Sequence, residues 1–162
     1  MPDTLSLLGT LVGARLKQHK RVLTCAESCT GGWVAQTVTA VAGSSEWFDR
    51  GFVTYSNQAK QEMLGVPAEV LERYGAVSEE TARAMAAGAL AHAQAQVALS
   101  ITGIAGPSGG TVDKPVGLVC FGWALAGGAP RTESCHFAGD REAVRRQAVI
   151  HALQGILALL PA

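Results

Sequence analysis

The chain has 162 residues, of which 48% are hydrophobic and 16% are charged. So low a charged fraction excludes an intrinsically disordered chain, and the length suits a single domain, expected over residues 1–162. Thirteen basic residues balance thirteen acidic ones, so the chain lacks the basic stripe through which proteins bind nucleic acid. No apolar run approaches the roughly 18 residues that a membrane span needs.

The beginning of the chain and its cysteines predict a cytoplasmic protein. Residues 1–17 carry no basic segment before their leucines, unlike a secretory signal peptide. The adjacent Cys135 and His136 have no second ligand pair at zinc spacing, and no C-x-x-C occurs. We therefore expect reduced, buried thiols, with no metal and no cofactor. The low charge content also suggests that some apolar surface is buried between subunits.

The first third of the chain alternates predicted helices and strands. Apolar residues at helical spacing follow the capping pair Asp3-Thr4, and short β-branched or aromatic runs indicate strands. Asn57 is a suitable N-cap for a helix that ends before Gly65 and Pro67. The expected elements are a helix over 4–16, a strand over 21–26, a helix over 33–41, a strand over 48–56 and a helix over 57–64.

The remainder predicts one long helix, three strands and a final helix. Ser78 is expected to cap the first helix, and Asp140 the last. Strands are expected over 97–102, 116–125 and 131–137. The middle one is apolar on both faces and so belongs inside the sheet, whereas the last is more polar and belongs near an edge. This order predicts an α/β fold, a three-layer α/β/α sandwich with a mixed, mostly parallel sheet.

Residues 26–32 (AESCTGG) are the first segment with residue types suited to chemistry. They lie where a strand ends and a helix begins, and open α/β sheets bind ligands at the carboxyl ends of strands. There the Ser28 hydroxyl would face free N–H groups, which suits an oxyanion or a phosphate. The alternative is that Ser28 or Thr30 only caps the helix, and that the glycines only form the turn.

Tyr55 and Lys60 follow the next strand in the same way. A lysine whose pKa is lowered can act as a general base for a serine nucleophile, and a tyrosine hydroxyl beside it can relay protons. The alternative is a surface lysine on a short helix and a tyrosine at a sheet edge. The spacing fits neither the dehydrogenase Y-x-x-x-K pair nor the S-x-x-K pattern of penicillin-binding proteins.

Two later segments suit ligand binding. The glycine-rich loop at 102–107 matches no nucleotide-binding fingerprint, but it lets backbone approach a ligand closely. The alternative is a flexible turn, which fits residues 108–114 better. Arg141 is expected in the first turn of the last helix, where the helix dipole disfavours a cation. A bound anion such as a phosphate would resolve that conflict, unless Arg141 simply points into water.

Taken together, these segments resemble the CinA family, in its C-terminal-domain type. The matching words are AESCTGG at 26–32, GSSEWFDRGFVTYSNQAK at 43–60, GAVSEET at 75–81, GIAGPSGG at 103–110, KPVG at 114–117 and GDREAVRRQA at 139–148. The resemblance covers nearly the whole chain. It implies hydrolysis of the carboxamide of nicotinamide mononucleotide to nicotinate mononucleotide and ammonia, in pyridine-nucleotide (NAD) salvage.

The resemblance also implies a metal-free Ser/Lys mechanism, no cofactor and a homodimer. Its catalytic residues fall on Ser28, Lys60 and Tyr55. Its substrate-binding residues fall on Thr30, Gly31, Gly32, Thr102, Gly103, Ala105, Gly106 and Arg141. The backbone groups that hold the oxyanion stay open between the turn at 30–32 and the Gly103 loop. A non-catalytic nucleotide-binding or competence- or DNA-damage-associated interaction module is the alternative function.

Overall fold

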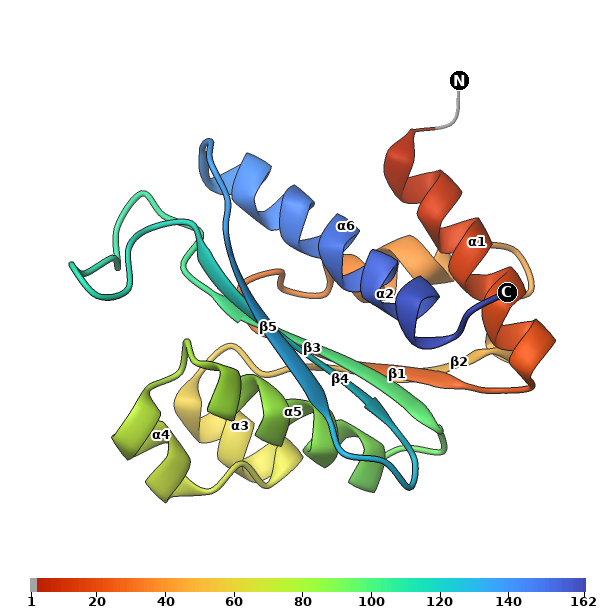
Figure 1. The fold of residues 1–162 in the computed structure, drawn as a ribbon, viewed down its shortest axis with the longest axis horizontal. Coiled ribbons are helices and arrows are strands. Elements are labelled where there is room, and N and C mark those ends of the chain that lie inside the picture. Colours follow the sequence, from red (N-terminus) through yellow and green to blue (C-terminus); the bar gives the residue numbers. More distant parts are fainter. Residues whose placement is uncertain (1–2) are drawn as a thin grey trace.

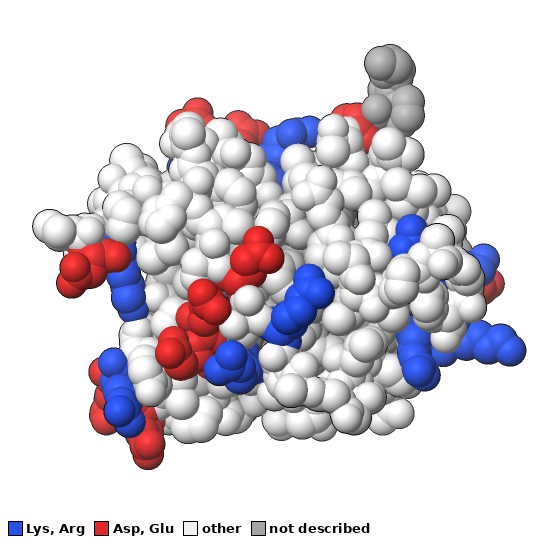
Figure 2. All heavy atoms as spheres, in the orientation of Figure 1, with Lys and Arg blue, Asp and Glu red and all other residues white. Residues whose placement is uncertain are grey.

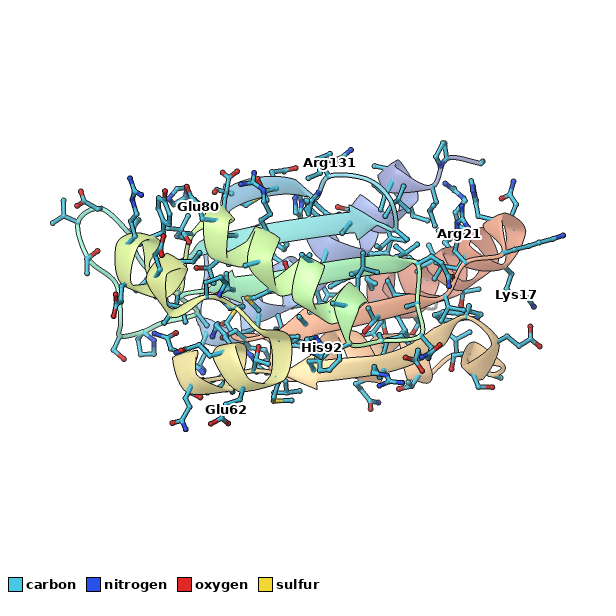
Figure 3. The ribbon with its side chains drawn as sticks, turned by 90° about the horizontal axis from the view of Figure 1, so that it is seen from below. Lys17, Arg21, Glu62, Glu80, His92 and Arg131 are labelled. Atoms are coloured by element: carbon cyan, nitrogen blue, oxygen red, sulfur yellow. The ribbon has the colours of Figure 1, made fainter. Side chains whose placement is uncertain are left out.

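A five-stranded sheet lies between two layers of helices in the computed structural model, which describes residues 3–162 (Figure 1). The helices on one face are α1 (Thr4–His19), α2 (Trp33–Thr39) and α6 (Arg141–Leu159). Those on the other face are α3 (Asn57–Leu64), α4 (Ala68–Tyr74) and α5 (Glu79–Ala91), and Figure 3 looks onto them. The predicted three-layer α/β/α sandwich is confirmed.

The sheet is mixed, as expected, and its strand order is β2-β1-β3-β4-β5. Its strands are β1 (Leu23–Glu27), β2 (Phe48–Val53), β3 (Val97–Gly103), β4 (Leu118–Leu125) and β5 (Arg131–His136). Strand β1 pairs in parallel with β2 and β3, while β4 is antiparallel to both β3 and β5. Because β1, β2 and β3 run the same way, the loops that follow them meet at one edge of the sheet.

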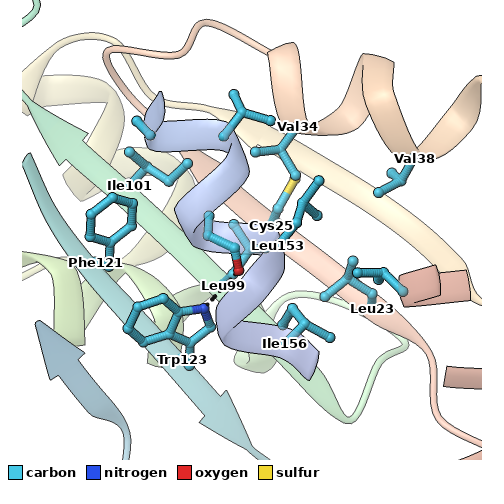
Figure 4. Close-up of a cluster of buried hydrophobic side chains, with 14 of the residues drawn as sticks. Leu23, Cys25, Val34, Val38, Leu99, Ile101, Phe121, Trp123, Leu153 and Ile156 are labelled. Atoms are coloured by element: carbon cyan, nitrogen blue, oxygen red, sulfur yellow. Dashed lines mark hydrogen bonds between the residues drawn. The ribbon is translucent and has the colours of Figure 1, made fainter. Parts of the chain in front are cut away.

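The larger part of the core lies between the sheet and the layer of α1, α2 and α6 (Figure 4). Trp123 on β4 is 1% exposed, and its indole Nε1 donates a 3.0 Å hydrogen bond to the carbonyl of Ala152 in α6. A Cβ at Gly155 would collide with the Trp123 ring, so glycine is needed where α6 crosses the strand. This contact fixes the height of α6 above the sheet.

Two details of the helices differ from the predictions. Ser56, and not Asn57, is the N-cap of α3: its hydroxyl accepts a hydrogen bond from the amide of Ala59. Helix α4 was not predicted, because Pro67 suggests only the end of the preceding helix. Here Pro67 precedes α4 as its N-cap residue, since a fixed φ near −65° also suits the start of a helix.

The surface carries few charges. On the face shown in Figure 2, most of the surface is uncharged, and acidic and basic side chains both appear on it. Across residues 3–162, no helix is long and apolar enough to cross a membrane.

Candidate active site

The structure places Ser28 and Lys60 in direct contact at the carboxyl edge of the sheet. Ser28 is the first residue after β1 and is 8% exposed, while Lys60, in α3, is 1% exposed. The Nζ atom of Lys60 donates hydrogen bonds of 3.0 Å to Ser28 Oγ and of 3.0 Å to the carbonyl oxygen of Thr54. Both acceptors are uncharged, so neither neutralises the ammonium group.

The surroundings of Lys60 favour its neutral form. Burial lowers the pKa of Lys60 from its ordinary 10.5, because the ammonium group loses hydration, while the nearby Cys29 acts in the opposite direction. A lowered pKa increases the fraction of free amine near neutral pH. A free amine beside a serine hydroxyl is able to accept its proton. The alternative interpretation, a surface lysine on a short helix, is excluded because Lys60 is buried.

Glu27, which the sequence analysis did not single out, organises the turn that follows β1. Its carboxylate is buried and accepts hydrogen bonds from the Thr30 hydroxyl (2.7 Å), from the amide of Val34 (2.9 Å) and from the amide of Ala35 (3.1 Å). These amides belong to the first turn of α2, where helix N–H groups lack backbone partners and favour a negative charge. Glu27 therefore does what a capping side chain would do.

This arrangement decides against a capping role for Ser28 or Thr30. The N-cap of α2 is Gly32, whose φ of 103° lies in the left-handed region and which has no side chain to accept a hydrogen bond. The Ser28 hydroxyl is thus left to Lys60. The signal in the sequence was an acidic residue that ends a strand six positions before a helix begins.

Arg141, the first residue of α6, joins two loops that are remote in sequence. Its Nη1 donates to the carbonyl of Gly106 (2.8 Å), and its Nη2 donates to the hydroxyl of Tyr55 (3.0 Å). Arg141 therefore does not simply point into water. Tyr55 is 62% exposed, and the contact of its hydroxyl is with Arg141.

A pocket of about 260 Å³ opens onto the Ser28–Lys60 pair. Of the predicted site residues, it is lined by Ser28, Lys60, Tyr55, Thr102, Gly103, Ala105, Gly106 and Arg141. The Thr102 hydroxyl donates to the carbonyl of Ala76 at 2.7 Å, so it also ties β3 to the segment before α5. Asn57 and Ser108 line the pocket as well, and sequence reasoning missed both.

Three predicted binding residues, Thr30, Gly31 and Gly32, lie instead in an adjacent pocket of about 600 Å³. Arg145 in α6 lines it too, and donates to the carbonyls of Cys29 (3.0 Å) and Thr30 (3.2 Å). Arg141 borders both pockets. The predicted binding residues therefore form two neighbouring groups that meet at Arg141.

Side chains able to ligate a metal ion come together elsewhere. Within residues 3–162, the one group of three histidine, cysteine or acidic side chains close enough to share an ion is Glu133, Cys135 and His151, on β5 and α6. None of the three lines the pocket at Ser28. All four cysteines are free thiols.

Comparison with known proteins gives a consistent result. The family model of the CinA C-terminal domain matches residues 6–160. The chain is 56% identical over 150 residues to nicotinamide-nucleotide amidohydrolase PncC of Enterobacter agglomerans, and the aligned region covers 93% of this chain and 92% of that protein. It is 48% identical over 157 residues to the protein of the same name from Pseudomonas putida, covering 97% and 98% of the two chains. Among solved structures, the competence/damage inducible protein CihA from Agrobacterium tumefaciens is similar with a TM-score of 0.94, at 41% identity, over 98% of this chain and 97% of that one.

Proposed function

The chain belongs to the CinA C-terminal domain family, and we propose that it hydrolyses nicotinamide mononucleotide to nicotinate mononucleotide and ammonia in pyridine-nucleotide salvage. It is an enzyme of the nicotinamide-nucleotide amidohydrolase type. One observation carries the mechanism: a serine hydroxyl lies 3.0 Å from a buried lysine amine at a pocket. An interaction module would have no use for such a pair.

In the proposed first step, Ser28 Oγ attacks the carboxamide carbon while Lys60 Nζ accepts the hydroxyl proton. A neutral lysine amine has two hydrogens and one lone pair. The Thr54 carbonyl accepts one of those hydrogens, which orients the amine and leaves its lone pair for the Ser28 hydroxyl. Deprotonation at the moment of attack is the activation that an alcohol nucleophile requires.

The developing oxyanion needs N–H donors that are not already used by the fold. The amide of Gly31 donates to the Ser28 carbonyl, and that of Trp33 donates to the Thr30 carbonyl, so both are engaged. We therefore assign the oxyanion to the amide of Cys29, which directly follows the nucleophile and belongs to a residue that lines the same pocket. Glu27 would keep the turn that follows β1 in place during the reaction, since it holds the Thr30 side chain.

Collapse of the tetrahedral intermediate breaks the carbon–nitrogen bond, and ammonia leaves with a proton returned from Lys60. The Tyr55 hydroxyl accepts a hydrogen bond from Arg141, which leaves its own hydrogen free to donate to the departing nitrogen. Water then attacks the Ser28 ester. Lys60 accepts a proton from this water, nicotinate mononucleotide is released, and the Ser28 hydroxyl is restored.

We assign the 5′-phosphate of the substrate to Arg141. Among the described residues, Arg141 forms no salt bridge, and its two hydrogen-bond acceptors are neutral oxygens. Its positive charge is therefore available to an anion, and guanidinium binds phosphate in a bidentate manner. The conflict between Arg141 and the dipole of α6 would then be relieved by the substrate.

The test is ammonia release by the purified chain. Nicotinamide mononucleotide should give equal amounts of ammonia and nicotinate mononucleotide, and Ser28→Ala should lose all but a residual rate while keeping its fold, since a single hydroxyl contributes little to the core. Nicotinamide riboside, which lacks the phosphate, should be hydrolysed with a higher KM than nicotinamide mononucleotide. No ammonia from the wild-type chain would refute the function, whereas near-normal turnover by folded Ser28→Ala would refute only the serine mechanism.

The assembly state belongs to the same proposal. The enzyme acts as a cytoplasmic homodimer. Residues 1–162 form one amidohydrolase domain, and residues 1–2 of it lie outside the described part of the chain. Light scattering coupled to size exclusion measures the dimer: a mass twice the 16.8 kDa of one chain is expected. A mass of one chain at assay concentration would contradict it.

A further inference from the structure

Glu133, Cys135 and His151 converge at one point between β5 and α6. Glu133 and Cys135 are two residues apart on β5, so their side chains lie on the same side of the strand. His151 Nε2 lies 2.9 Å from Glu133 Oε1 and 3.5 Å from Cys135 Sγ, and that sulfur lies 3.7 Å from Glu133 Oε1. The three atoms form a small triangle with one nitrogen, one sulfur and one oxygen.

Hydrogen bonding explains two sides of this triangle, because Glu133 Oε1 can accept from both His151 Nε2 and Cys135 Sγ, but it leaves the 3.5 Å contact between Nε2 and Sγ unexplained. A single ring nitrogen, Nε2, contacts both the carboxylate and the thiol. It carries either one hydrogen or one lone pair, which points along one line in the ring plane and so serves one partner. A cation at the centre of the triangle would be shared equally by all three atoms.

The size of the triangle fits one face of a tetrahedral zinc site. With zinc bonds of about 2.0–2.2 Å to nitrogen and oxygen and about 2.3 Å to sulfur, tetrahedral angles place the sulfur about 3.6 Å from each of the other two ligand atoms. The observed distances of 3.5 and 3.7 Å agree. The nitrogen–oxygen separation would widen from 2.9 Å to about 3.4 Å, a small movement for the exposed Glu133 side chain.

The surroundings preorganise the histidine and leave room for a fourth ligand. The His151 ring packs against aromatic rings, with centroid distances of 4.6 Å to Phe121, 5.9 Å to Trp123 and 6.2 Å to Phe137. A pocket of about 200 Å³, lined in part by Glu133 and His151, adjoins the triangle and gives access to water.

We propose that Glu133, Cys135 and His151 bind one Zn²⁺ ion, with water as the fourth ligand. Thiolate, imidazole and carboxylate together select zinc over magnesium or calcium, which prefer oxygen ligands alone. The carboxylate and the thiolate also balance the charge of the ion. Strands β3 and β4 separate β5 from β1, so the ion lies roughly 14 Å from Ser28 and joins the edge strand β5 to α6.

This group of residues was not predicted from the sequence, because the neighbouring Cys135 and His136 suggest the wrong pair. Successive residues of a strand point to opposite faces, so His136 is directed away from Cys135. The actual partner is His151, sixteen positions further on, in the following helix.

Cobalt absorption tests the proposal, because Co²⁺ bound to thiolate in a tetrahedral site gives a charge-transfer band and intense visible bands. Titration of the metal-free chain with Co²⁺ should produce these bands with an end point of one ion per chain, and one equivalent of Zn²⁺ should abolish them. Cys135→Ser, His151→Gln and Glu133→Gln should each weaken binding at least roughly a hundredfold, since even residues that only support ligands cost about 10–100-fold.

Cys120→Ser and His136→Gln are the matched controls, because they remove another thiol and the adjacent imidazole. Both should bind Co²⁺ like the wild type. Zn²⁺ should raise the thermal unfolding midpoint of the wild type and of both controls, but not that of Cys135→Ser, while ammonia release stays unchanged in that variant. The proposal is overturned if the wild-type chain with Co²⁺ shows no thiolate charge-transfer band. It is also overturned if both Cys135→Ser and Glu133→Gln, a change at an exposed residue, bind Zn²⁺ as tightly as the wild type.

Discussion

Lys60 is buried, whereas most lysine side chains lie at the protein surface. It is 1% exposed, its hydrogen-bond acceptors are uncharged, and burial lowers its pKa. A buried ammonium without a carboxylate partner opposes folding, so the rest of the core must offset its desolvation. In the proposed mechanism, this burial provides a base that is within reach of Ser28 before any substrate binds.

Lys60→Arg separates a base from a binding charge. Guanidinium stays protonated at any usable pH, so it cannot accept the serine proton. We expect the kcat of Lys60→Arg to fall nearly as far as that of Lys60→Ala, by at least about 100-fold for a lost general base. Steady-state kinetics on nicotinamide mononucleotide measures both. Substantial kcat with a raised KM in Lys60→Arg would reassign Lys60 to binding.

The lowered pKa of Lys60 also makes stability depend on pH. Between its value in the folded chain and the ordinary 10.5, the unfolded chain binds one proton more, so the free energy of unfolding rises with pH. Lys60→Met lacks this dependence. Relative to that variant, the wild type should gain stability from pH 7 to pH 10, by at most about 1.4 kcal/mol for each unit by which the pKa is lowered. Urea unfolding of both proteins at pH 7 and pH 10 measures the gain, and parallel values would show an unshifted lysine.

At the residue scale, the sequence predicted the position of those candidate side chains that follow a strand of the sheet. Ser28 and Tyr55 lie just after strands, and Lys60 lies in the helix that follows the second of these strands, so the parallel pairing of β1 and β2 brings all three to one edge of the sheet. Glu27 was not predicted, since its place at the end of a strand and six positions before a helix does not by itself show that its carboxylate turns back onto that helix. The division of the binding residues between two pockets depends on side-chain directions that local patterns do not contain.

At the scale of elements, the position of Lys60 depends on how closely α3 approaches α5. Gly88 in α5 lies against the carbonyl of Leu64, the last residue of α3, and a Cβ there would collide with it. The close contact of the two helices therefore requires glycine. Both helices were predicted from the sequence, although the cap of α3 was placed at Asn57 instead of Ser56. Helix α4 was not predicted, because a seven-residue helix between Pro67 and Gly75 has the sequence features of a loop.

Gly88→Ala should lower kcat as well as stability. In an open helix this change would stabilise by about 1 kcal/mol, but here overpacking costs about 1–3 kcal/mol and displaces α3, which moves Lys60 away from Ser28. Ala87→Gly is the control, since Ala87 is exposed on the same helix and its loss costs about 1 kcal/mol without moving α3. Equal kcat in the two variants, both folded at the assay temperature, would show that the contact does not position Lys60.

At the scale of the whole molecule, the proposed hydrolysis and the proposed zinc site are independent. The first uses the carboxyl edge of β1, β2 and β3, and the second lies on β5 and α6. Exhaustive chelation should therefore leave ammonia release intact while it lowers the thermal unfolding midpoint of zinc-loaded protein. A loss of activity that a divalent ion restores would mean that the reaction itself needs a metal.

The long helix α6 begins at the pocket, with Arg141, and ends roughly 27 Å away, at a rise of 1.5 Å per residue. Arg15 of α1 donates to the carbonyls of Leu157 and Leu160, which anchors that far end. In Figure 1 the end of the chain accordingly lies beside α1, across the molecule from the loop between β3 and β4. A fluorescent protein or an affinity tag joined after residue 162 would therefore lie away from the entrance of the pocket. Immobilisation of the enzyme through this tag should leave its kcat unchanged.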